Sequence, residues 1–426
     1  LMKTFLPSNE NLKKGQLEGL QWTVTHAYRG SETYRKKFDG LNLKPEDIQS
    51  LDDLKRLPFT SAEDLSEGYP FPLQSVPMRD VVRIHTSSGT TGKRKVLCYT
   101  QKDIKDWTHF FARCFELAGL TVEDRVQIAV GYGPWTAGIG FQMACEAFGS
   151  MAIPIGPGNI ETQTEYLIDF NSTVLCCTAS MGLLLGEEVE RRGIRDKINL
   201  KKMIYGAERS SDAMRKRIKS LLGLEDIYDI SGMTELYGPG TGIECSAHQG
   251  IHYWSDYYIL EILNPDTSET LTPGEVGEMV VTTLQKEAVP LIRYRTHDLT
   301  SLIQEPCPCG NQFPRHDRLQ GRTDDMFIFR GVNIYPSQID NLLSSLPGVG
   351  SEYQVFLNQM EGKDKLTLRI ERAQNTNSTG DSQTAENIKT LIKHKVFVTP
   401  DVDVVDYGSL PRSERKTKRV SDVREI

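Results

Sequence analysis

The stretch that decides the fold is residues 173–208, TVLCCTASMGLLLGEEVERRGIRDKINLKKMIYGAE. A short apolar run, TVLCCT, leads into a helical stretch from Met181, and a second apolar run, KMIYGAE, follows. Short β-type runs separated by a helix are typical of parallel strands, because a parallel pair needs a long crossover connection. These residues therefore predict a β-α-β unit of a doubly wound sheet.

The same alternation continues outward from this unit. The apolar runs VVRIHT (81–86), VQIAV (126–130) and MAIPI (151–155) precede it, with helices expected at 103–118 and from residue 161. A further helix is expected at 211–222. We therefore predict an α/β fold whose large N-terminal domain contains doubly wound sheets.

The pattern changes twice beyond residue 240. Residues from about 245 to 323 carry strand-like runs with turns, such as YWSDYYILEILNP, and predict a strand-rich subdomain. A small α/β unit follows, which includes a polar segment at 374–383 that we expect to be disordered. The predicted domains are thus 1–323 and 324–426.

Composition and charge restrict the function classes. The chain has 426 residues and a formal net charge of −7, which argues against a dedicated nucleic-acid-binding protein. Its apolar stretches are shorter than the ~18 residues of a membrane-spanning helix, and residues 1–15 lack the apolar run of a secretory signal. The eight cysteines are expected to be reduced thiols of a cytoplasmic protein.

A loop dense in hydroxyls and glycines directly follows the first apolar run: Thr86, Ser87, Ser88, Gly89, Thr90, Thr91, Gly92 and Lys93. Glycine lets successive N–H groups point into one concavity, and the hydroxyls add donors. The spacing is not that of a Walker A motif. The segment predicts a phosphate-binding loop of another kind, with a surface turn as the alternative.

Four later segments carry charged residues that could bind a nucleotide or its metal ion. Glu235, in SGMTE, follows a strand-like run and could bind Mg²⁺, and Asp298, in RYRTHD, could bind two ribose hydroxyls. Arg322 precedes Asp324 at the predicted domain boundary, and Lys416 lies in the basic segment PRSERKTKR. Taken alone, Glu235, Asp298 and Lys416 are more typical of ordinary solvated or ion-paired residues, and the Arg322 segment is equally compatible with a salt-bridged turn.

Together, in order and spacing, these segments resemble the adenylate-forming acyl-CoA ligases, and within them the branch that acts on aryl acids. The resemblance runs from about residue 8 to the end and is densest in HTSSGTTGK, YGAE, SGMTE, TTLQKEAVPLIRYRTHDLT, GRTDDMFIFRGVNIYPSQI and LPRSERKTKR. It implies that a carboxylate attacks the α-phosphate of ATP to give an acyl-adenylate and pyrophosphate. The thiol of coenzyme A then displaces AMP, after rotation of a mobile C-terminal domain. Phenylacetate is the leading substrate.

The resemblance also implies a role for each motif. Residues 86–93 would hold the β- and γ-phosphates, Glu235 would bind Mg²⁺ with Thr234 beside it in the catalytic set, and Lys416 would bridge the carboxylate and the α-phosphate. Asp298 and Arg322 would bind the ribose, and Asp324 would be the hinge between the domains. Gly331 would let the pantetheine arm pass close to the backbone. The residues implied to contact adenine are Gly206, Ala207, Glu208 and Asp229.

Two further sites depend on side chains around this nucleotide site. The position that usually carries an adenine-stacking aromatic ring in this family is Ser231, and Tyr228 is the candidate replacement. The acyl pocket is expected near residues 131–138, where Tyr132 and Trp135 offer flat apolar surface for an aryl ring. Ordinary core packing of these two rings is the alternative.

Four residues have the chemistry of a structural zinc site. Cys307 and Cys309 form a tight C-x-C, and Cys245 and His252 lie upstream in ECSAHQGIH. Three thiolates and one imidazole make a closed tetrahedral set, and some members of the family resemble this pattern. His248 is the competing imidazole, and free thiols without metal are the alternative.

The main hypothesis is therefore an AMP-forming aryl-acid:CoA ligase that uses ATP, Mg²⁺ and coenzyme A. An enzyme that passes the adenylate to another acceptor is the first alternative. A non-catalytic nucleotide-binding protein is the second, and the residues Ser231 and Arg415 favour it because they depart from the family pattern. The expected partners are small molecules rather than nucleic acid or a membrane, and a homodimer is left open.

Overall fold

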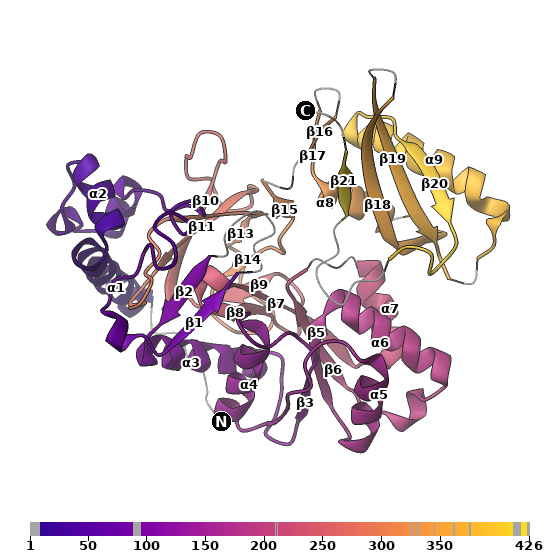
Figure 1. Cartoon of the computed structure of the whole chain (residues 1–426), viewed down its shortest axis with the longest axis horizontal. Helices are drawn as coiled ribbons and strands as arrows, with labels where there is room; N and C mark the ends of the chain where they lie inside the picture. The colour runs from indigo at the N-terminus through magenta and orange to yellow at the C-terminus, as the bar shows by residue number, and fades with distance from the viewer. Residues whose placement is uncertain are drawn as a thin grey trace. The chain divides into compact units, whose positions relative to one another are not determined.

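A computed structural model describes residues 9–87, 95–208, 210, 212–323, 325, 327–329, 332–344, 346–360, 363–374, 376–411 and 419–423 (Figure 1). The chain forms two compact units. The first comprises Leu1–Cys177, Lys197–Ala207 and Glu225–Leu319, and the second comprises Thr178–Asp196, Glu208–Leu224 and Gln320–Ile426. Within the described residues, no helix is both long and apolar enough to cross a membrane.

The first unit is built on strands from three sheets. They are β1 (Arg83–Thr86), β2 (Val96–Tyr99), β3 (Arg125–Ile128), β4 (Met151–Ile153), β5 (Val174–Thr178), β6 (Lys202–Gly206), β7 (Asp226–Met233), β8 (Gly238–Glu244), β9 (Ile251–Tyr253), β10 (Tyr258–Leu263), β11 (Gly277–Thr283), β12 (Tyr294–Thr300), β13 (Leu302–Ile303) and β14 (Arg315–His316). Its helices are α1 (Asn9–Gly30), α2 (Glu32–Gly40), α3 (Gln101–Leu117), α4 (Ala137–Phe148) and α5 (Ile160–Asp169).

The main sheet of this unit has the order β13-β14-β9-β8-β7-β6-β5-β3-β4 among the described residues. β3 pairs in parallel with β4 and β5, and β6 pairs in parallel with β7. Beyond β7 the neighbouring strands pair antiparallel. The predicted α/β class is confirmed. The segment predicted as strand-rich, about 245–323, contributes β9, β13 and β14 to this sheet and β10, β11 and β12 to a separate antiparallel sheet.

The first apolar run differs from the prediction. Only residues 83–86 of VVRIHT form β1, which pairs antiparallel with β2 in a separate two-stranded sheet. The connection between these two strands is too short for a crossover helix, so only a hairpin can form. Apolar composition alone could not distinguish this hairpin from another parallel strand.

Helix α3 anchors the core of the first unit. Thr100 and Asp103 form a capping box at its start, and the rings of Trp107 and Phe111 are fully buried on one face. Strand β8 approaches this face closely. A Cβ on Gly240, whose φ is +90°, would lie 2.5 Å from the Phe111 ring, so the approach requires glycine.

Strands β10, β11 and β12 form an antiparallel sheet that is interrupted in β12. The register shifts between Glu278 and Val280 of β11, opposite residues 295–299 of β12. His297 has a φ of +65° within this bulge, and Asp298 follows it. Bulges of this kind commonly redirect a side chain next to a functional site.

The second unit contains the remaining strands and long helices. They are α6 (Ala179–Arg192), α7 (Asp212–Leu222), β15 (Gly321–Arg322), β16 (Phe327–Phe329), β17 (Val332–Ile334), α8 (Pro336–Ser344), β18 (Val349–Met360), β19 (Lys363–Arg372), α9 (Asp381–Val396), β20 (Asp401–Val405) and β21 (Val420–Asp422). Short 3₁₀ helices of the two units lie at Pro45–Asp47, Leu51–Arg56, Met78–Asp80, Arg195–Lys197, Thr234–Leu236 and Ser378–Gly380.

A four-stranded sheet of order β20-β19-β18-β21 forms the C-terminal part of this unit. One core joins side chains of this sheet with α8 and α9. The segment 374–383, which we predicted to be disordered, instead contains a 3₁₀ helix and the first turn of α9. The Asn377 side chain accepts the Thr379 N–H, and Asp381 pairs with Arg372 at 2.6 Å, so the polar side chains hold the backbone in place.

Candidate active site

Glu235 lies on a 3₁₀ turn, Thr234–Leu236, that directly follows β7. Its side chain is largely buried, and Lys95 Nζ donates to Oε1 at 3.1 Å. The Tyr294 hydroxyl donates to the same oxygen at 3.5 Å. Glu235 thus lies past the carboxyl end of a sheet strand, where open α/β sheets bind ligands. A carboxylate in this setting is a suitable ligand for Mg²⁺.

Two buried side chains hold the carbonyl groups of this turn. Tyr99 donates to the Tyr237 carbonyl at 2.6 Å and lies 3.2 Å from the Thr234 carbonyl. Lys286 donates from Nζ to the Glu235 carbonyl at 2.9 Å. Burial lowers the pKa of Lys286 to about 8, so its ammonium group is still protonated at neutral pH.

The described ends of the predicted phosphate loop lie beside Glu235. The Ser87 N–H donates to the Lys95 carbonyl at 3.0 Å, and the Thr86 N–H donates to the Pro134 carbonyl at 2.8 Å. Residues 88–93 of the loop lie outside the described residues. Lys95 therefore connects the loop to Glu235, a contact that the sequence analysis did not predict.

Asp298 belongs to the bulge of β12, the strand that also carries Tyr294. Its side chain is half-buried, and its N–H donates to the Thr296 hydroxyl at 3.0 Å. Glu235 and Asp298 are thus connected through Tyr294 and one strand.

The predicted adenine-contacting residues begin at the end of β6. A Cβ on Gly206 would lie 2.6 Å from the Ile230 carbonyl oxygen, and Ala207 has a φ of +70°, so the chain turns sharply against β7. The Asp229 N–H donates to Glu244 Oε2 at 3.1 Å. Ser231 Oγ lies 3.5 Å from Thr241 Oγ1.

Tyr228 does not support the role of adenine-stacking replacement for Ser231. Positions 228 and 231 are an odd number of residues apart in β7, so their side chains point to opposite faces. Tyr228 is buried, and its ring packs against His248 with centroids 5.6 Å apart.

The remaining predicted nucleotide and hinge residues fall into two groups. Glu208 and Arg322 belong to the second unit. The Glu208 carboxylate accepts the Ser180 N–H at 2.5 Å, and burial raises its pKa, while Arg322 is half-buried in β15. Asp324, Gly331, Arg415 and Lys416 lie outside the described residues.

The two aromatic residues of the predicted acyl pocket lie in the loop before α4. A Cβ on Gly138 would lie 2.5 Å from the Tyr132 ring, and one on Gly131 would lie 2.9 Å from the Trp135 ring. Each ring therefore covers a glycine, and both pack against the main core. Within the described part of the chain, the buried Tyr132 hydroxyl has no hydrogen-bond partner.

The structure brings Cys245, His252, Cys307 and Cys309 together, with their ligand atoms all within 4.8 Å of one another. Cys245 Sγ lies 3.5 Å from Cys307 Sγ, and Cys309 Sγ lies 3.4 Å from His252 Nε2. His252 Nδ1 bonds to the Phe313 carbonyl at 2.8 Å, which leaves Nε2 available as a ligand. Tetrahedral zinc with Zn–S of about 2.3 Å and Zn–N of about 2.0 Å needs ligand atoms about 3.5–3.8 Å apart, so the set fits zinc.

His248 has a different environment from this cluster. Its Nε2 lies 2.9 Å from Asp226 Oδ1, and its Nδ1 lies 3.4 Å from Glu244 Oε2. These two carboxylates raise the pKa of His248 to about 9. His252, rather than His248, is therefore the imidazole of the cysteine cluster.

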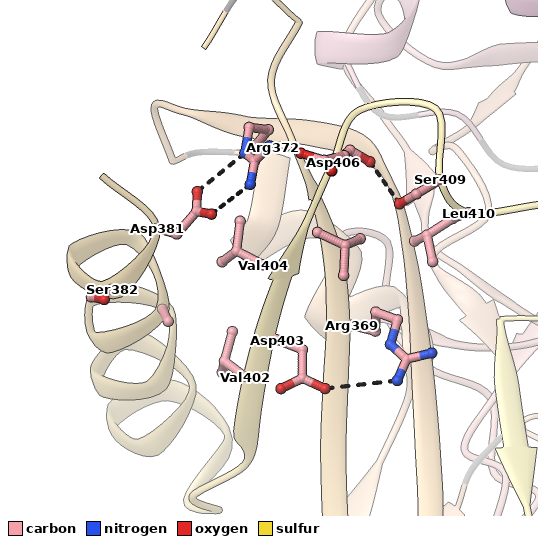
Figure 2. Close-up of a pocket in the computed structure, with 12 residues that line it drawn as sticks. Arg369, Arg372, Asp381, Ser382, Val402, Asp403, Val404, Asp406, Ser409 and Leu410 are labelled. Atoms are coloured by element: carbon pink, nitrogen blue, oxygen red, sulfur yellow. Dashed lines mark hydrogen bonds and ion pairs between the residues drawn. The ribbon is translucent and has the colours of Figure 1, made fainter. Parts of the chain in front are cut away.

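A hollow of about 710 Å³ in the second unit lies between α9 and β20 (Figure 2). Arg372 pairs there with Asp381 at 2.6 Å and also with Asp406, and Arg369 lies 3.8 Å from Asp403. Because both arginines already face aspartates, the hollow does not offer the surplus positive charge that would attract an anionic ligand.

Comparisons with known proteins identify two family domains in this chain. Residues 27–285 match the family model of AMP-binding enzymes, and residues 331–424 match the AMP-binding enzyme C-terminal domain. The phenylacetate–coenzyme A ligase of Escherichia coli strain K12 is 39% identical over 98% of this chain and 96% of its own length. The chain belongs to the phenylacetate–coenzyme A ligase family of AMP-binding enzymes. The resemblance inferred from the motifs is thus confirmed.

A second curated ligase and a solved structure are also similar to this chain. The phenylacetate–coenzyme A ligase of Thermus thermophilus is 38% identical over 97% of each chain. A crystal structure of 2-hydroxyisobutyryl-CoA ligase in the postadenylation state, in complex with 2-HIB-AMP, superposes with a TM-score of 0.89, at 24% identity over 98% of this chain and 90% of that one. That likeness confirms the fold of an adenylate-forming ligase.

Proposed function

We propose that this protein adenylates a small aryl carboxylic acid with ATP and transfers the acyl group to coenzyme A, releasing AMP and pyrophosphate. Phenylacetate is the acid that we propose first. The observation that carries the proposal is the identity of 37–39% to four phenylacetate–coenzyme A ligases over 97–98% of this chain. The arrangement around Glu235 is consistent with it.

Adenylation brings a carboxylate to a triphosphate, and both are anions, so the site must neutralise charge and align the attack. Glu235 would hold Mg²⁺, which supplies positive charge at the phosphate oxygens. Lys95, 3.1 Å from Glu235, adds a fixed positive charge at the same place. Thr86 and Ser87 would begin the phosphate loop, and Thr234 would belong to the same catalytic turn.

The nucleoside would lie along the neighbouring strand ends. Gly206 and Ala207 would present the backbone of this turn to the adenine base, with Asp229 on the next strand. The Asp298 carboxylate would accept the ribose hydroxyls. Tyr132 and Trp135 would form the aryl pocket.

The C-terminal part completes the proposed reaction. Lys416 would bridge the acid and the α-phosphate during adenylation, and Arg322 and Glu208 would contact the nucleotide. We propose that domains 1–323 and 324–426 reorient about Asp324 between the two half-reactions. Gly331 would then allow the pantetheine arm to pass close to the backbone.

We further propose that Cys245, His252, Cys307 and Cys309 bind a structural zinc ion. A closed set of four protein ligands leaves no coordination position for substrate, so this ion would stabilise the fold around β9 and the 307–313 loop.

A panel of aryl acids tests the proposed function. AMP and pyrophosphate release is measured for each acid with and without coenzyme A. We expect phenylacetate to give AMP and a thioester only when coenzyme A is present. Pyrophosphate exchange without any coenzyme A consumption would indicate another acceptor, and absence of exchange with every acid would refute ligase activity.

A further inference from the structure

Lys286 is a cation without an assigned role in the first unit. It lies in the connection between β11 and β12 and is fully buried. Lysine is almost never fully buried unless its charge is compensated, because removing an ammonium group from water costs several kcal/mol. A buried charge of this kind requires a specific reason.

The surroundings of Lys286 show how its charge is accommodated. The rings of Tyr99 and Tyr237 lie 5.5 and 5.1 Å from Nζ, within the range of a cation–π contact. Asp103 is also fully buried and attracts the ammonium group. Its carboxylate accepts the N–H groups of Glu287 and Ala288 at 2.7 and 2.9 Å, which fixes the segment that carries Lys286.

The bond that Lys286 makes points to its role. Nζ donates to the backbone carbonyl of Glu235 at 2.9 Å. Tyr99 holds the Tyr237 carbonyl of the same turn. With its backbone held by these bonds, Glu235 pairs through its carboxylate with Lys95, 3.1 Å away.

We propose that Lys286 is a positioning residue that fixes the backbone of the Glu235 turn so that the Glu235 carboxylate is oriented for the magnesium ion of MgATP. This inference rests on the proposed function, because it assigns the purpose of the turn to adenylation. A carboxylate that is already oriented binds a cation without first losing rotational freedom. Fixing the turn therefore raises the affinity of the site for Mg²⁺. Lys286 itself touches neither substrate nor metal.

The decisive variant is Lys286→Met, which keeps the apolar stem and removes the donor and the charge. ATP–pyrophosphate exchange is measured with saturating ATP and acid while Mg²⁺ is titrated. We expect the Mg²⁺ concentration for half-maximal exchange to rise about tenfold, as for the loss of one charged hydrogen bond. The KM for the aryl acid should not change, because Lys286 is not expected to contact the acid.

Arg293→Met is the matched control. Arg293 lies in the same connection, is also buried, and pairs with Glu261 at 3.0 Å rather than with the Glu235 turn. Its loss should lower the melting temperature and leave the Mg²⁺ requirement of the folded enzyme unchanged. A purely structural role for Lys286 would give the two variants the same kinetic profile.

The outcomes separate this inference from the proposed function. A folded Lys286→Met enzyme with the wild-type Mg²⁺ requirement, or with an equal rise in the KM for the acid, overturns the positioning role. If Lys286→Met does not fold, Lys286→Gln is titrated in the same way. Its amide nitrogen is one bond closer to the backbone than Nζ and so cannot replace the bond to the Glu235 carbonyl, and an unchanged Mg²⁺ requirement again overturns the positioning role. Absence of exchange by the wild-type enzyme refutes the proposed function instead, and Mg²⁺-dependent ATP binding measured by calorimetry then compares the same variants.

Discussion

Replacement of His248 by glutamine tests the assignment of the two imidazoles near the cysteine cluster. Asp226 and Glu244 raise the pKa of His248 from 6.5 to about 9, so the folded state binds this proton more tightly than the unfolded state. A raised pKa of a cation stabilises the fold fully below pH 6.5, and this stabilisation is lost as the pH rises through about 9.

The size of the effect follows from the shift and from the exposure of the ring. A shift from 6.5 to about 9 corresponds to about 3 kcal/mol at low pH. Because the His248 side chain is 30% exposed, solvent screening reduces this to about 1–2 kcal/mol. We therefore expect His248→Gln to lower the free energy of unfolding by about 1–2 kcal/mol at pH 6 and by much less at pH 10.

Urea unfolding of both proteins across this pH range measures the difference, and the zinc content is measured in parallel. His248→Gln should retain the metal, whereas His252→Gln, the matched variant, should lose it. Loss of zinc from His248→Gln, or a stability difference that is the same at pH 6 and pH 10, would refute the reasoning.

Three further predictions concern the active site and the metal. Glu235→Gln should lower pyrophosphate exchange about 10²-fold at saturating ATP, because the amide is a poor Mg²⁺ ligand, and a wild-type rate would contradict the assignment. Cys309→Ala should reduce the zinc content to well below one ion per chain and lower the melting temperature, whereas retained zinc would exclude this residue as a ligand. Trp135→Ala should raise the KM for phenylacetate about tenfold and leave the KM for ATP unchanged, and an equal rise in both would indicate that the ring only supports the core.

The parallel core of the fold could be predicted because its strands leave a local signature. Continuous apolar runs such as 173–178 are typical of strands that are buried on both faces, and helices separate them. The run 81–86 that contains β1 also begins with apolar residues, and its antiparallel pairing with β2 depends on the length of the connection. The start of α9 depends on the ion pair between Arg372 and Asp381, which side-chain pattern alone does not reveal.

The candidate site was predictable in its residue types and not in its contacts. Carboxylates, thiols and imidazoles are the usual metal ligands, so Glu235 and the cysteine cluster could be named as candidates from the sequence. Lys95 and Glu235 are 140 residues apart, and only the folded chain brings them together. Lys286 gave no signal, because a lysine in a sequence is expected to be exposed.

We propose that a lysine from the C-terminal domain, Lys416, completes the ATP site of the N-terminal domain for the first half-reaction alone. The most direct test measures both half-reactions of Lys416→Ala. We predict that acyl-adenylate formation falls by about 10²–10³-fold, while thioester formation from preformed acyl-adenylate and coenzyme A stays near the wild-type rate. An equal loss in both half-reactions, or no loss in the first, would contradict the account.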